Sequence, residues 1–370
     1  MAAAPVKTDA ERLFDAQEII RRKNNELLAI RGDLARQHRE NDTAENIRRT
    51  IFGLSEHDPA PPSWVHRASG PSVHRGGPCT IWSDWHYSEV IDPDQVGGAN
   101  EFNCKIAKRR AQKLVDTTID LCHNHMGSAD KTYPGIVVML GGDMLSGSIH
   151  EELAETNERT AWQAVNDLTD ILAGCIDTMA TKFGKVFLPC VVGNHGRDTI
   201  KPRLKHAVFH SYDWGIYCNL ARHFKNTPHV QFMIPNQTDA RFDVFGHRYL
   251  LTHGDNMGVK GGDGIIGAIG PIMRGSMKIH ASEAEIGRDF DTACICHWHQ
   301  YIALPGLIVN NSLKGYDEYA RLRLRAKYSR PSQALWFTHP QHGITAHWQV
   351  YLEPKFNKRE ASKTWVTFPE

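Results

Sequence analysis

The sequence has almost no net charge and no apolar run long enough to cross a membrane. Nothing in its 370 residues approaches the roughly 18 consecutive apolar residues of a membrane helix. Lys and Arg (43) balance Asp and Glu (42), so a polyanionic partner would have to bind to a local patch of charge. The first residues, MAAAPVKTDAERLF, lack the apolar core of a secretory signal. We therefore expect a cytoplasmic protein with no membrane partner.

The sequence also lacks paired cysteines of the kind that bind structural zinc or form a disulfide framework. Its 8 cysteines are scattered through apolar segments without a CxxC pair, which predicts buried free thiols in a reducing compartment. Histidine, by contrast, is abundant, with 21 residues, and this excess directs attention to metal ligands. The apolar fraction of 41% excludes a mostly disordered chain.

Composition divides the chain into four parts. Residues 1–54 are rich in Glu, Arg, Gln and Leu and predict a helical arm, which would pack on the body or on a second copy in a homodimer. A small DNA-binding helical module is the alternative, although residues 1–60 carry 10 basic and 11 acidic side chains. Residues 55–78 contain many prolines and glycines and predict a linker. Residues 79–352 form the predicted main domain, and residues 353–370 form a polar tail.

Within the main domain, short β-rich runs alternate with longer helical ones, which is typical of an α/β layered domain. The predicted strands are 79–83, 135–140, 185–192, 229–234, 241–245, 249–252, 292–296 and 307–310. The predicted helices are 102–125, 151–183, 201–224 and 265–278.

Polar residues that can bind metals follow five of these predicted strands. The five motifs are Asp84-Trp85-His86, Gly141-Gly142-Asp143, Gly193-Asn194-His195, His253-Gly254-Asp255 and Cys296-His297-Trp298-His299. Because strand C-termini in α/β sheets share one edge, the five loops are expected to converge. Carboxylate, imidazole and amide ligands suit divalent ions such as Mn²⁺, Fe²⁺ or Zn²⁺. A carboxylate can also bridge two such metal ions, and two metal ions held close together can bind a phosphoryl group between them.

In this order, the motifs resemble those of the calcineurin-like metallophosphoesterase superfamily: D-x-H, GD-x-x-[DE], GNH-[DE], H and GH-x-H. The resemblance covers about residues 79–312. It implies an α/β fold with two mixed β-sheets sandwiched between helices in four layers, and the N-terminal helical extension is additional. The Asp-Arg-Gly that follows the second motif in phosphoprotein phosphatases is absent here, so the sequence looks closer to the nuclease-like and phage- or bacterial-type branches.

The resemblance also implies a role for each motif residue. One metal would be bound by Asp84, His86 and His299, the other by Asn194, His253 and His297, and Asp143 would bridge them. His195 would be the non-ligand catalytic histidine beside the phosphate, assisted by Asn194. The implied cofactors are two divalent ions, Mn²⁺ first, with Fe²⁺, Zn²⁺ or Ni²⁺ as alternatives. The implied reaction is in-line attack of a metal-bridging hydroxide on phosphorus.

Three positions depart from the family pattern. The second acid of GD-x-x-[DE] is Ser146, and the acid after GNH is Gly196, so the usual partner of the catalytic histidine is missing. Asp198, two residues further on, is a possible replacement. Cys296 stands where GH-x-H has glycine. No departure removes an implied metal ligand, so they affect the expected catalytic efficiency more than the expected metal binding.

Two basic clusters follow the motifs and suggest a substrate surface. Residues 196–206 carry four basic side chains and one acid, and residues 314–330 carry six basic side chains, two acids and three tyrosines. Cations mixed with aromatic rings suit nucleic acids, and a solvated surface is the alternative. The glycine-rich segment 254–276 is either a flap over the phosphate or a tightly packed loop and helix. The candidate substrate-binding residues are Arg197, Lys201, Arg203 and Arg274.

The sequence therefore favours a dinuclear metal-dependent phosphoesterase, with a phosphodiesterase and in particular a nuclease as the first reading. A phosphomonoesterase acting on small phosphates or phosphoproteins is the alternative within this class. A metal-bound module that binds nucleic acid or protein with little turnover is the alternative from another class, and the missing acids at positions 146 and 196 motivate it.

Overall fold

The structure, a computed structural model, describes residues 17–18, 21–23, 26, 60–66, 76–125, 133–259 and 268–355. The chain divides into two compact units, Met1–Glu56 and His57–Glu370. The described residues of the first unit are helical and include the ion pairs Glu18–Arg21 and Lys23–Glu26. Most of the predicted arm, linker and tail lies outside the described residues. No helix within the described ranges is long and apolar enough to span a bilayer.

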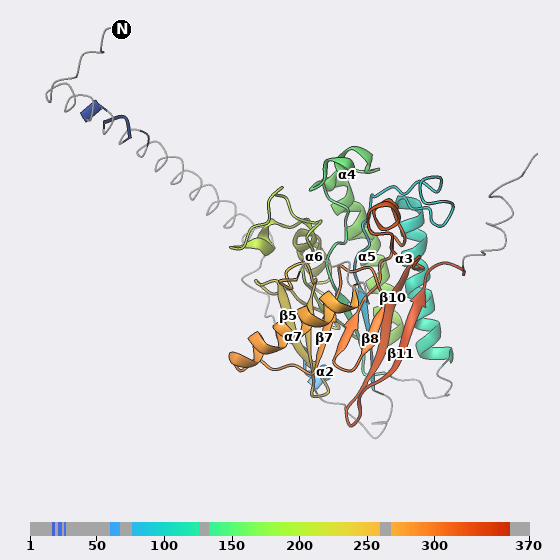
Figure 1. The fold of residues 1–370 in the computed structure, drawn as a ribbon. Helices are drawn as coiled ribbons and strands as arrows, with labels where there is room; N and C mark the ends of the chain where they lie inside the picture. The colour runs from blue at the N-terminus through green and yellow to red at the C-terminus, as the bar shows by residue number, and fades with distance from the viewer. Residues whose placement is uncertain are drawn as a thin grey trace, which may run out of the picture. The chain divides into compact units, whose positions relative to one another are not determined.

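The second unit is built on two mixed β-sheets (Figure 1). The first has the order β11-β10-β1-β2-β3-β4, with β1 to β4 parallel and β10 and β11 antiparallel. Its strands are β1 (Gly77–Trp82), β2 (Ile136–Leu140), β3 (Val186–Pro189), β4 (Val230–Met233), β10 (Ser332–His339) and β11 (Gly343–Tyr351).

The second sheet has the order β5-β6-β7-β9-β8, in which β6, β7 and β9 are parallel. Its strands are β5 (Asp239–Val244), β6 (His247–Thr252), β7 (Thr292–Ile295), β8 (Ile302–Leu304) and β9 (Leu307–Val309). The strands β1, β2 and β3 are buried at every position, as expected for parallel strands covered on both faces.

The main core lies between the two sheets. Alternate residues of the strands point into it, among them Ile81, Met139, Leu251, Cys294 and Ile308. The residues in between point to the outer faces. Leu250, Ala293 and Ile295 of the second sheet pack with Ile272 of α7 (Ile269–Glu285) in a separate cluster. This two-residue period is what assigns each strand residue to one layer.

Helices complete the outer layers. The helices α3 (Cys104–Asp120), α5 (Ala161–Phe183) and α6 (Tyr212–His223) pack against one another and contact the first sheet, whereas α7 lies in front of the second sheet in Figure 1. The remaining short helices are α2 (Ser63–His66) and α4 (Glu151–Thr156). The layers therefore run helix, sheet, sheet, helix, which confirms the predicted fold class.

Two predicted helices were too long. The helix predicted over 151–183 breaks after Thr156, and α5 starts again where Thr160 and Gln163 form a capping box. The helix predicted over 201–224 begins only at Tyr212, because residues 201–206 form an exposed irregular loop and His206 has a left-handed φ of 55°. The hairpin of β10 and β11, together with β8, was not predicted at all. All 8 cysteines are free and buried, as predicted.

Candidate metal centre

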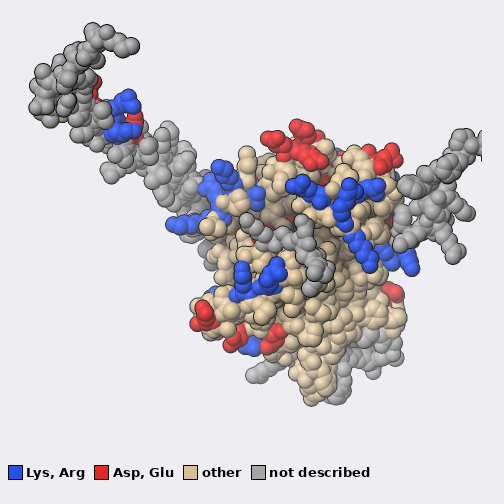
Figure 2. All heavy atoms as spheres, in the orientation of Figure 1, with Lys and Arg blue, Asp and Glu red and all other residues tan. Residues whose placement is uncertain are grey.

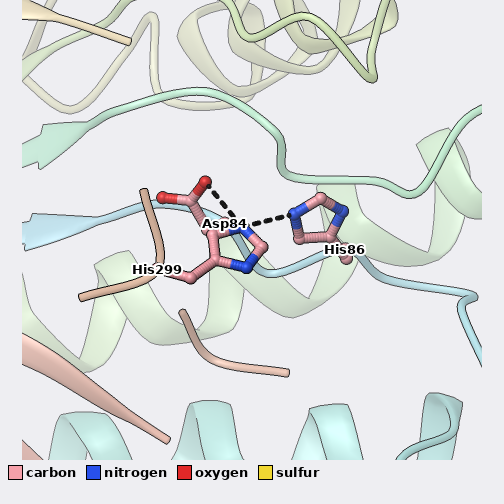
Figure 3. Close-up of side chains that lie close together, drawn as sticks. All are labelled: Asp84, His86 and His299. Carbon is pink, nitrogen blue, oxygen red and sulfur yellow. Dashed lines mark hydrogen bonds and ion pairs between the residues drawn. The ribbon is translucent and has the colours of Figure 1, made fainter. Parts of the chain in front are cut away.

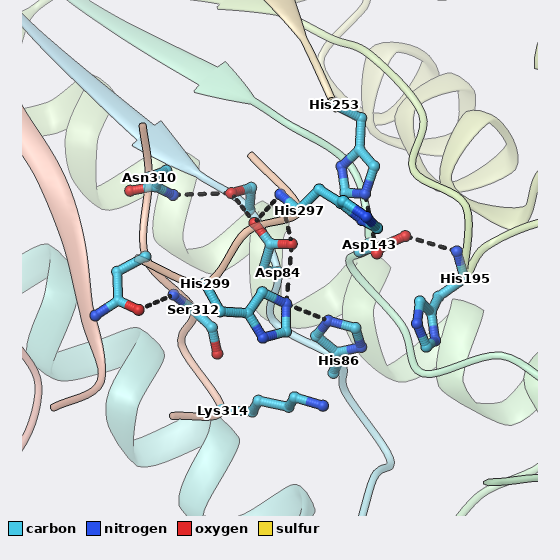
Figure 4. Close-up of polar contacts among 12 residues, drawn as sticks. Asp84, His86, Asp143, His195, His253, His297, His299, Asn310, Ser312 and Lys314 are labelled. Atoms are coloured by element: carbon cyan, nitrogen blue, oxygen red, sulfur yellow. Dashed lines mark hydrogen bonds and ion pairs between the residues drawn. The ribbon is translucent and has the colours of Figure 1, made fainter. Parts of the chain in front are cut away.

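The polar residues after five strands come together at one place in the fold (Figure 4). Asp84 and His86 follow β1, Asp143 follows β2 and Asn194 follows β3. From the second sheet, His253 follows β6, and His297 and His299 follow β7. Among the described residues, all three clusters of metal-ligating side chains consist of members of this group and the neighbouring His195. The expected convergence is therefore observed, but the strands belong to two sheets, and the packing of these sheets brings the two groups of residues together.

The first cluster consists of Asp84, His86 and His299 (Figure 3). Oδ1 of Asp84 lies 3.3 Å from Nε2 of His299, which in turn lies 3.1 Å from Nε2 of His86. Two imidazole nitrogens facing each other beside a carboxylate present lone pairs to a common point. A cation placed between them would stabilise this arrangement.

The second cluster consists of Asp143, His253 and His297. Nε2 of His253 lies 3.0 Å from Oδ2 of Asp143 and 3.2 Å from Oδ1 of Asn194. Nδ1 of His253 lies 2.8 Å from the carbonyl oxygen of Gly141. Because a carbonyl only accepts hydrogen bonds, the proton is on Nδ1, and Nε2 is left as the ligand atom.

The donor set fits divalent ions in both clusters. Nitrogen and oxygen ligands at about 2.0–2.2 Å from one ion lie about 3.0–3.5 Å from each other in tetrahedral or octahedral geometry. The ligand atoms named above are 3.0–3.3 Å apart, which is this spacing. Asp143 also clusters with His86 and His195, so its carboxylate stands between the two groups, where a bridging ligand would be.

The protonation states also suit metal binding. Burial, reinforced by the Lys314 charge, lowers the pKa of His86, and burial with the nearby His253 lowers that of His297 to about 4. Burial would raise the pKa of Asp143, but His253 and His195 outweigh it and hold this carboxyl well below its usual range. Burial disfavours the charged form of His253 as well, yet the Asp143 carboxylate raises its pKa. A metal ion bound at Nε2 of His253 would therefore displace a proton from this nitrogen.

The backbone of the ligand loops is strained. Among the described non-glycine residues, nine have a positive φ, and five of these are candidate ligands: Asp84 (53°), His86 (45°), Asp143 (51°), His297 (69°) and His299 (50°). A left-handed conformation costs a residue with a Cβ about 1–2 kcal/mol. Such residues gather where the surrounding structure forces an unusual geometry, as in functional sites.

A buried polar network orients Asp84. Oγ of Ser83 donates to Oδ2 of Asp84 at 2.5 Å, and the backbone N–H of His297 donates to Oδ1 at 3.1 Å. Nδ2 of Asn310 donates to Ser83 Oγ at 2.8 Å. Asn310 was not among the predicted site residues, although it directly follows β9 and so repeats the pattern of polar residues after a strand.

Lys314 lies inside the protein and does not belong to a basic surface, so its assignment to the second basic cluster was wrong. Its Nζ lies 2.7 Å from Oε1 of Glu89 and 2.7 Å from Oδ2 of Asp317, and all three side chains are buried. Oε2 of Glu89 lies 3.6 Å from Nδ1 of His86, and neither atom has a hydrogen-bond partner. The ion network therefore lies next to a candidate ligand, and Figure 4 shows Lys314 on the same side of the centre as His86.

His195 lies beside the clusters, with its ring edge-on to His86 at a centroid distance of 4.6 Å. Its Nδ1 donates to the carbonyl oxygen of Ser146 at 3.0 Å. The backbone at position 146, where the family motif has its second acid, therefore orients the ring. Asp198 was considered as the replacement partner of His195, but it pairs with His210 at 3.1 Å. Burial lowers the pKa of His195. The neighbouring ring of His150, which the sequence analysis did not single out, lies 5.6 Å away.

The other two positions that differ from the family motifs, Cys296 and Gly196, are accommodated by the packing around them. A Cβ at Gly141 would overlap Sγ of Cys296, so the side chain of Cys296 fits because residue 141 has none. A carboxylate from α6, Asp213, lies against Gly196 and binds the backbone of the ligand loops. Sequence reasoning missed Asp213, since no motif points to it.

The candidate substrate-binding residues lie at the surface or brace a loop. Lys201, Arg203 and Arg274 are exposed, the last of them on α7. Arg197 donates to the carbonyl oxygens of Thr199 at 3.0 Å and of Ile200 at 3.2 Å, so it holds the 197–201 turn.

Comparisons with known proteins add little. No family model matches the sequence, and no curated protein does. One similar solved structure is a candidate 5′-nucleotidase from Staphylococcus aureus in complex with α-ketoglutarate (12% identity, TM-score 0.34). The alignment covers 77% of this chain but only 57% of that protein. Another is a dimetal phosphatase from Danio rerio (9% identity, TM-score 0.35), with coverage of 75% and 100%. At such identities, the function has to come from the side chains of the metal centre.

Proposed function

We propose that this chain is a dinuclear metal-dependent phosphoesterase. The observation that carries the proposal is the position of Asp143, whose carboxylate belongs both to the cluster with His253 and His297 and to the cluster with His86 and His195. A carboxylate in this position can bridge two ions. When bound, two divalent ions would neutralise phosphoryl oxygens and supply a nucleophile at neutral pH. Mn²⁺ is the first metal to test, followed by Fe²⁺, Zn²⁺ and Ni²⁺.

Two protein side chains have roles besides metal binding. His195 is held by the Ser146 carbonyl through Nδ1, which leaves Nε2 free to hydrogen-bond to the departing oxygen or protonate it. Asn194 faces His253 through Oδ1, so its Nδ2 group remains available to donate a hydrogen bond to a phosphoryl oxygen. Both residues come from the loop after β3 and therefore act on the same side of the centre.

A phosphodiester, in particular nucleic acid, is the substrate that the surface favours. Lys201, Arg203 and Lys205 are exposed on the loop that follows the GNH motif. Arg323, Arg325 and Lys327 are exposed on the segment that follows the buried Lys314. Lys and Arg gather at the upper left and upper right of the face in Figure 2, over the positions of these two segments in Figure 1. Cations on two sides of a phosphate site suit a chain of phosphates better than an isolated one.

Exposed apolar side chains lie among these cations. Leu204 is 94% exposed and Ile200 80%, and Tyr319 is 63% exposed beside the second segment. An aromatic ring such as that of Tyr319 can stack on an unpaired base, and aliphatic side chains such as Leu204 and Ile200 can make apolar contacts with it. This favours single-stranded over double-stranded nucleic acid as the first polymer to test.

The test compares Mn²⁺-dependent hydrolysis of bis-p-nitrophenyl phosphate and p-nitrophenyl phosphate. We expect the diester to be preferred, Asp143→Asn to lose both metal binding and turnover, and His195→Ala to bind metal but lose about 10²–10⁴-fold in rate. A preference for the monoester would support a phosphomonoesterase instead. Metal and nucleic-acid binding without turnover under any of the four metals would support a binding module.

The surface is tested separately on single-stranded DNA. Lys201→Ala/Arg203→Ala should weaken binding and reduce its salt dependence, because fewer counterions are released. Lys108→Ala, which removes an exposed cation from α3, is the matched control and should leave binding unchanged. Equal effects of both changes would contradict the proposed surface.

A further inference from the structure

Asp213 lies in the first turn of α6 and is fully buried. Its Oδ2 accepts hydrogen bonds from the backbone N–H groups of Asp143 and Gly193, both at 2.9 Å, and its Oδ1 accepts one from Met144 at 3.1 Å. These donors belong to the two loops that carry the bridging candidate and the Asn194-His195 pair. One carboxylate therefore joins the two loops, 70 and 20 residues away from it in the sequence.

The space for this carboxylate exists because residue 196 is glycine. A Cβ at Gly196 would lie 2.9 Å from both Cγ and Oδ2 of Asp213 and 3.0 Å from Oγ of Ser211. Gly196 is not among the described glycines with a positive φ, so its backbone conformation does not itself require glycine. What position 196 requires is the absence of a side chain.

The backbone holds the two partners together at the same point. The N–H of Tyr212 donates to the carbonyl oxygen of Gly196 at 2.6 Å, and Arg197 and Ser211 form an isolated antiparallel bridge. The start of α6 is thus paired with the residues directly after the GNH motif. The carboxylate of Asp213 therefore occupies the space into which a side chain at position 196 would project.

We infer that Asp213 replaces the acid of the GNH-[DE] motif and is the positioning residue for both halves of the centre. It holds the N–H of Asp143, and Oδ1 of Asp143 in turn accepts from the N–H of His195 at 2.7 Å. Loss of the carboxylate would release the bridging ligand and the catalytic histidine together. The role in turnover rests on the proposed function, whereas the role in metal binding does not.

If Asp213 has this role, moving the carboxylate from position 213 to position 196 should restore part of the Mn²⁺ affinity that is lost without Asp213. In Asp213→Asn, a single amide oxygen is left for three donors and an NH₂ group faces them, so Mn²⁺ affinity should fall about 10–100-fold. Gly196→Asp alone should also weaken metal binding, because its side chain collides with Asp213. The double variant Gly196→Asp/Asp213→Ala should bind Mn²⁺ at least tenfold more tightly than Asp213→Ala.

The measurement is Mn²⁺ titration calorimetry on the full chain, well below the unfolding temperature, with kcat and KM determined in parallel. Asp198→Asn, which removes a nearby acid bound to His210, is the control and should stay within about twofold of wild-type affinity. Wild-type metal affinity in Asp213→Asn would overturn the inference. The inference would also be overturned if Gly196→Asp/Asp213→Ala bound Mn²⁺ no more tightly than Asp213→Ala. If Asp213→Ala does not fold, the comparison is made with Asp213→Asn instead. An inactive wild-type protein would count against the phosphoesterase, and the affinities would still decide this inference.

Discussion

Removing the buried cation Lys314 should be among the most destabilising single changes in this protein. Its Nζ lies 2.7 Å from carboxylate oxygens of both Glu89 and Asp317, and the three side chains are only 5%, 6% and 8% exposed. At an effective dielectric constant of about 20, each contact amounts to about 6 kcal/mol of Coulomb attraction, offset by the loss of hydration. Lys314→Met leaves two buried carboxylates without a cation, and the expected cost is about 3–5 kcal/mol.

Urea unfolding at pH 7.5, with metal removed by chelation, measures this cost. The matched control is Glu89→Gln/Lys314→Met/Asp317→Asn, which removes all three charges and should recover more than half of the lost stability. Without Lys314, the folded-state pKa values of both carboxyls rise above their unfolded values. The folded state then binds protons more readily, so the deficit of Lys314→Met should shrink as the pH falls from 8 to 5. A loss below about 1 kcal/mol at pH 7.5, or a deficit that grows on acidification, would refute this electrostatic account.

Three further predictions concern the metal centre and the pH dependence of stability. Saturating Mn²⁺ should raise the free energy of unfolding by about 2.7 kcal/mol per site at 100 times the dissociation constant, and EDTA should reverse the gain in a urea titration. Ser83→Ala should weaken Mn²⁺ binding about 10–100-fold by freeing Asp84, while Thr80→Val on the preceding strand β1 should not, as calorimetry would show. Burial lowers the pKa of His247, so the unfolded state binds its proton more readily, and stability should fall as the pH drops below about 6.5. In thermal melts at pH 8 and 5.5, His247→Gln should lose less stability on acidification than the wild type does.

The departures from the family motifs change how the centre is supported but leave its candidate ligands in place. Ser146 contributes its backbone carbonyl to His195, where the family pattern has an acidic side chain. Gly196 provides space, and Asp213 provides the carboxylate. Reading the missing acids as a sign of weak catalysis therefore overlooks groups that reach the same loops from elsewhere in the fold.

The parts of the fold that could be predicted are those with a local signal. The strands β1, β2, β6 and β7 are short apolar runs bounded by polar or glycine residues, and this pattern is visible within a window of about ten residues. The hairpin of β10 and β11 was missed although its register pairs it with β1. Its second strand is intermediate or exposed at every position except Val350, so it lacks the continuous buried run of the central strands. The alternation of Ile344, Ala346, Trp348 and Val350 with polar residues was the signal that could have revealed it.

The assignment of Lys314 to a basic cluster was wrong for a different reason. Lys314 and Arg323 are close in the sequence and carry the same charge, yet one is buried in an ion network and the other is exposed. Charge counted along the chain does not show which side chains face solvent. Burial depends on the loop after β9, which brings Lys314 between Glu89 and Asp317.

The sequence by itself determined the candidate ligands, because polar residues follow β1, β2, β3, β6 and β7, and parallel strands of one sheet end at a shared edge. The packing of the two sheets on each other then brings the two groups of ligands together. It also determined the layered α/β class, through apolar runs of strand length alternating with helical ones. Only the tertiary structure decided which groups hold these ligands in place: Asp213 from α6, Lys314 paired with Glu89 next to His86, and Asn310 after β9. These contacts join residues up to 227 positions apart, and such distant pairing leaves no periodic trace in the chain. It arises from packing, which selects buried polar partners by geometry and charge.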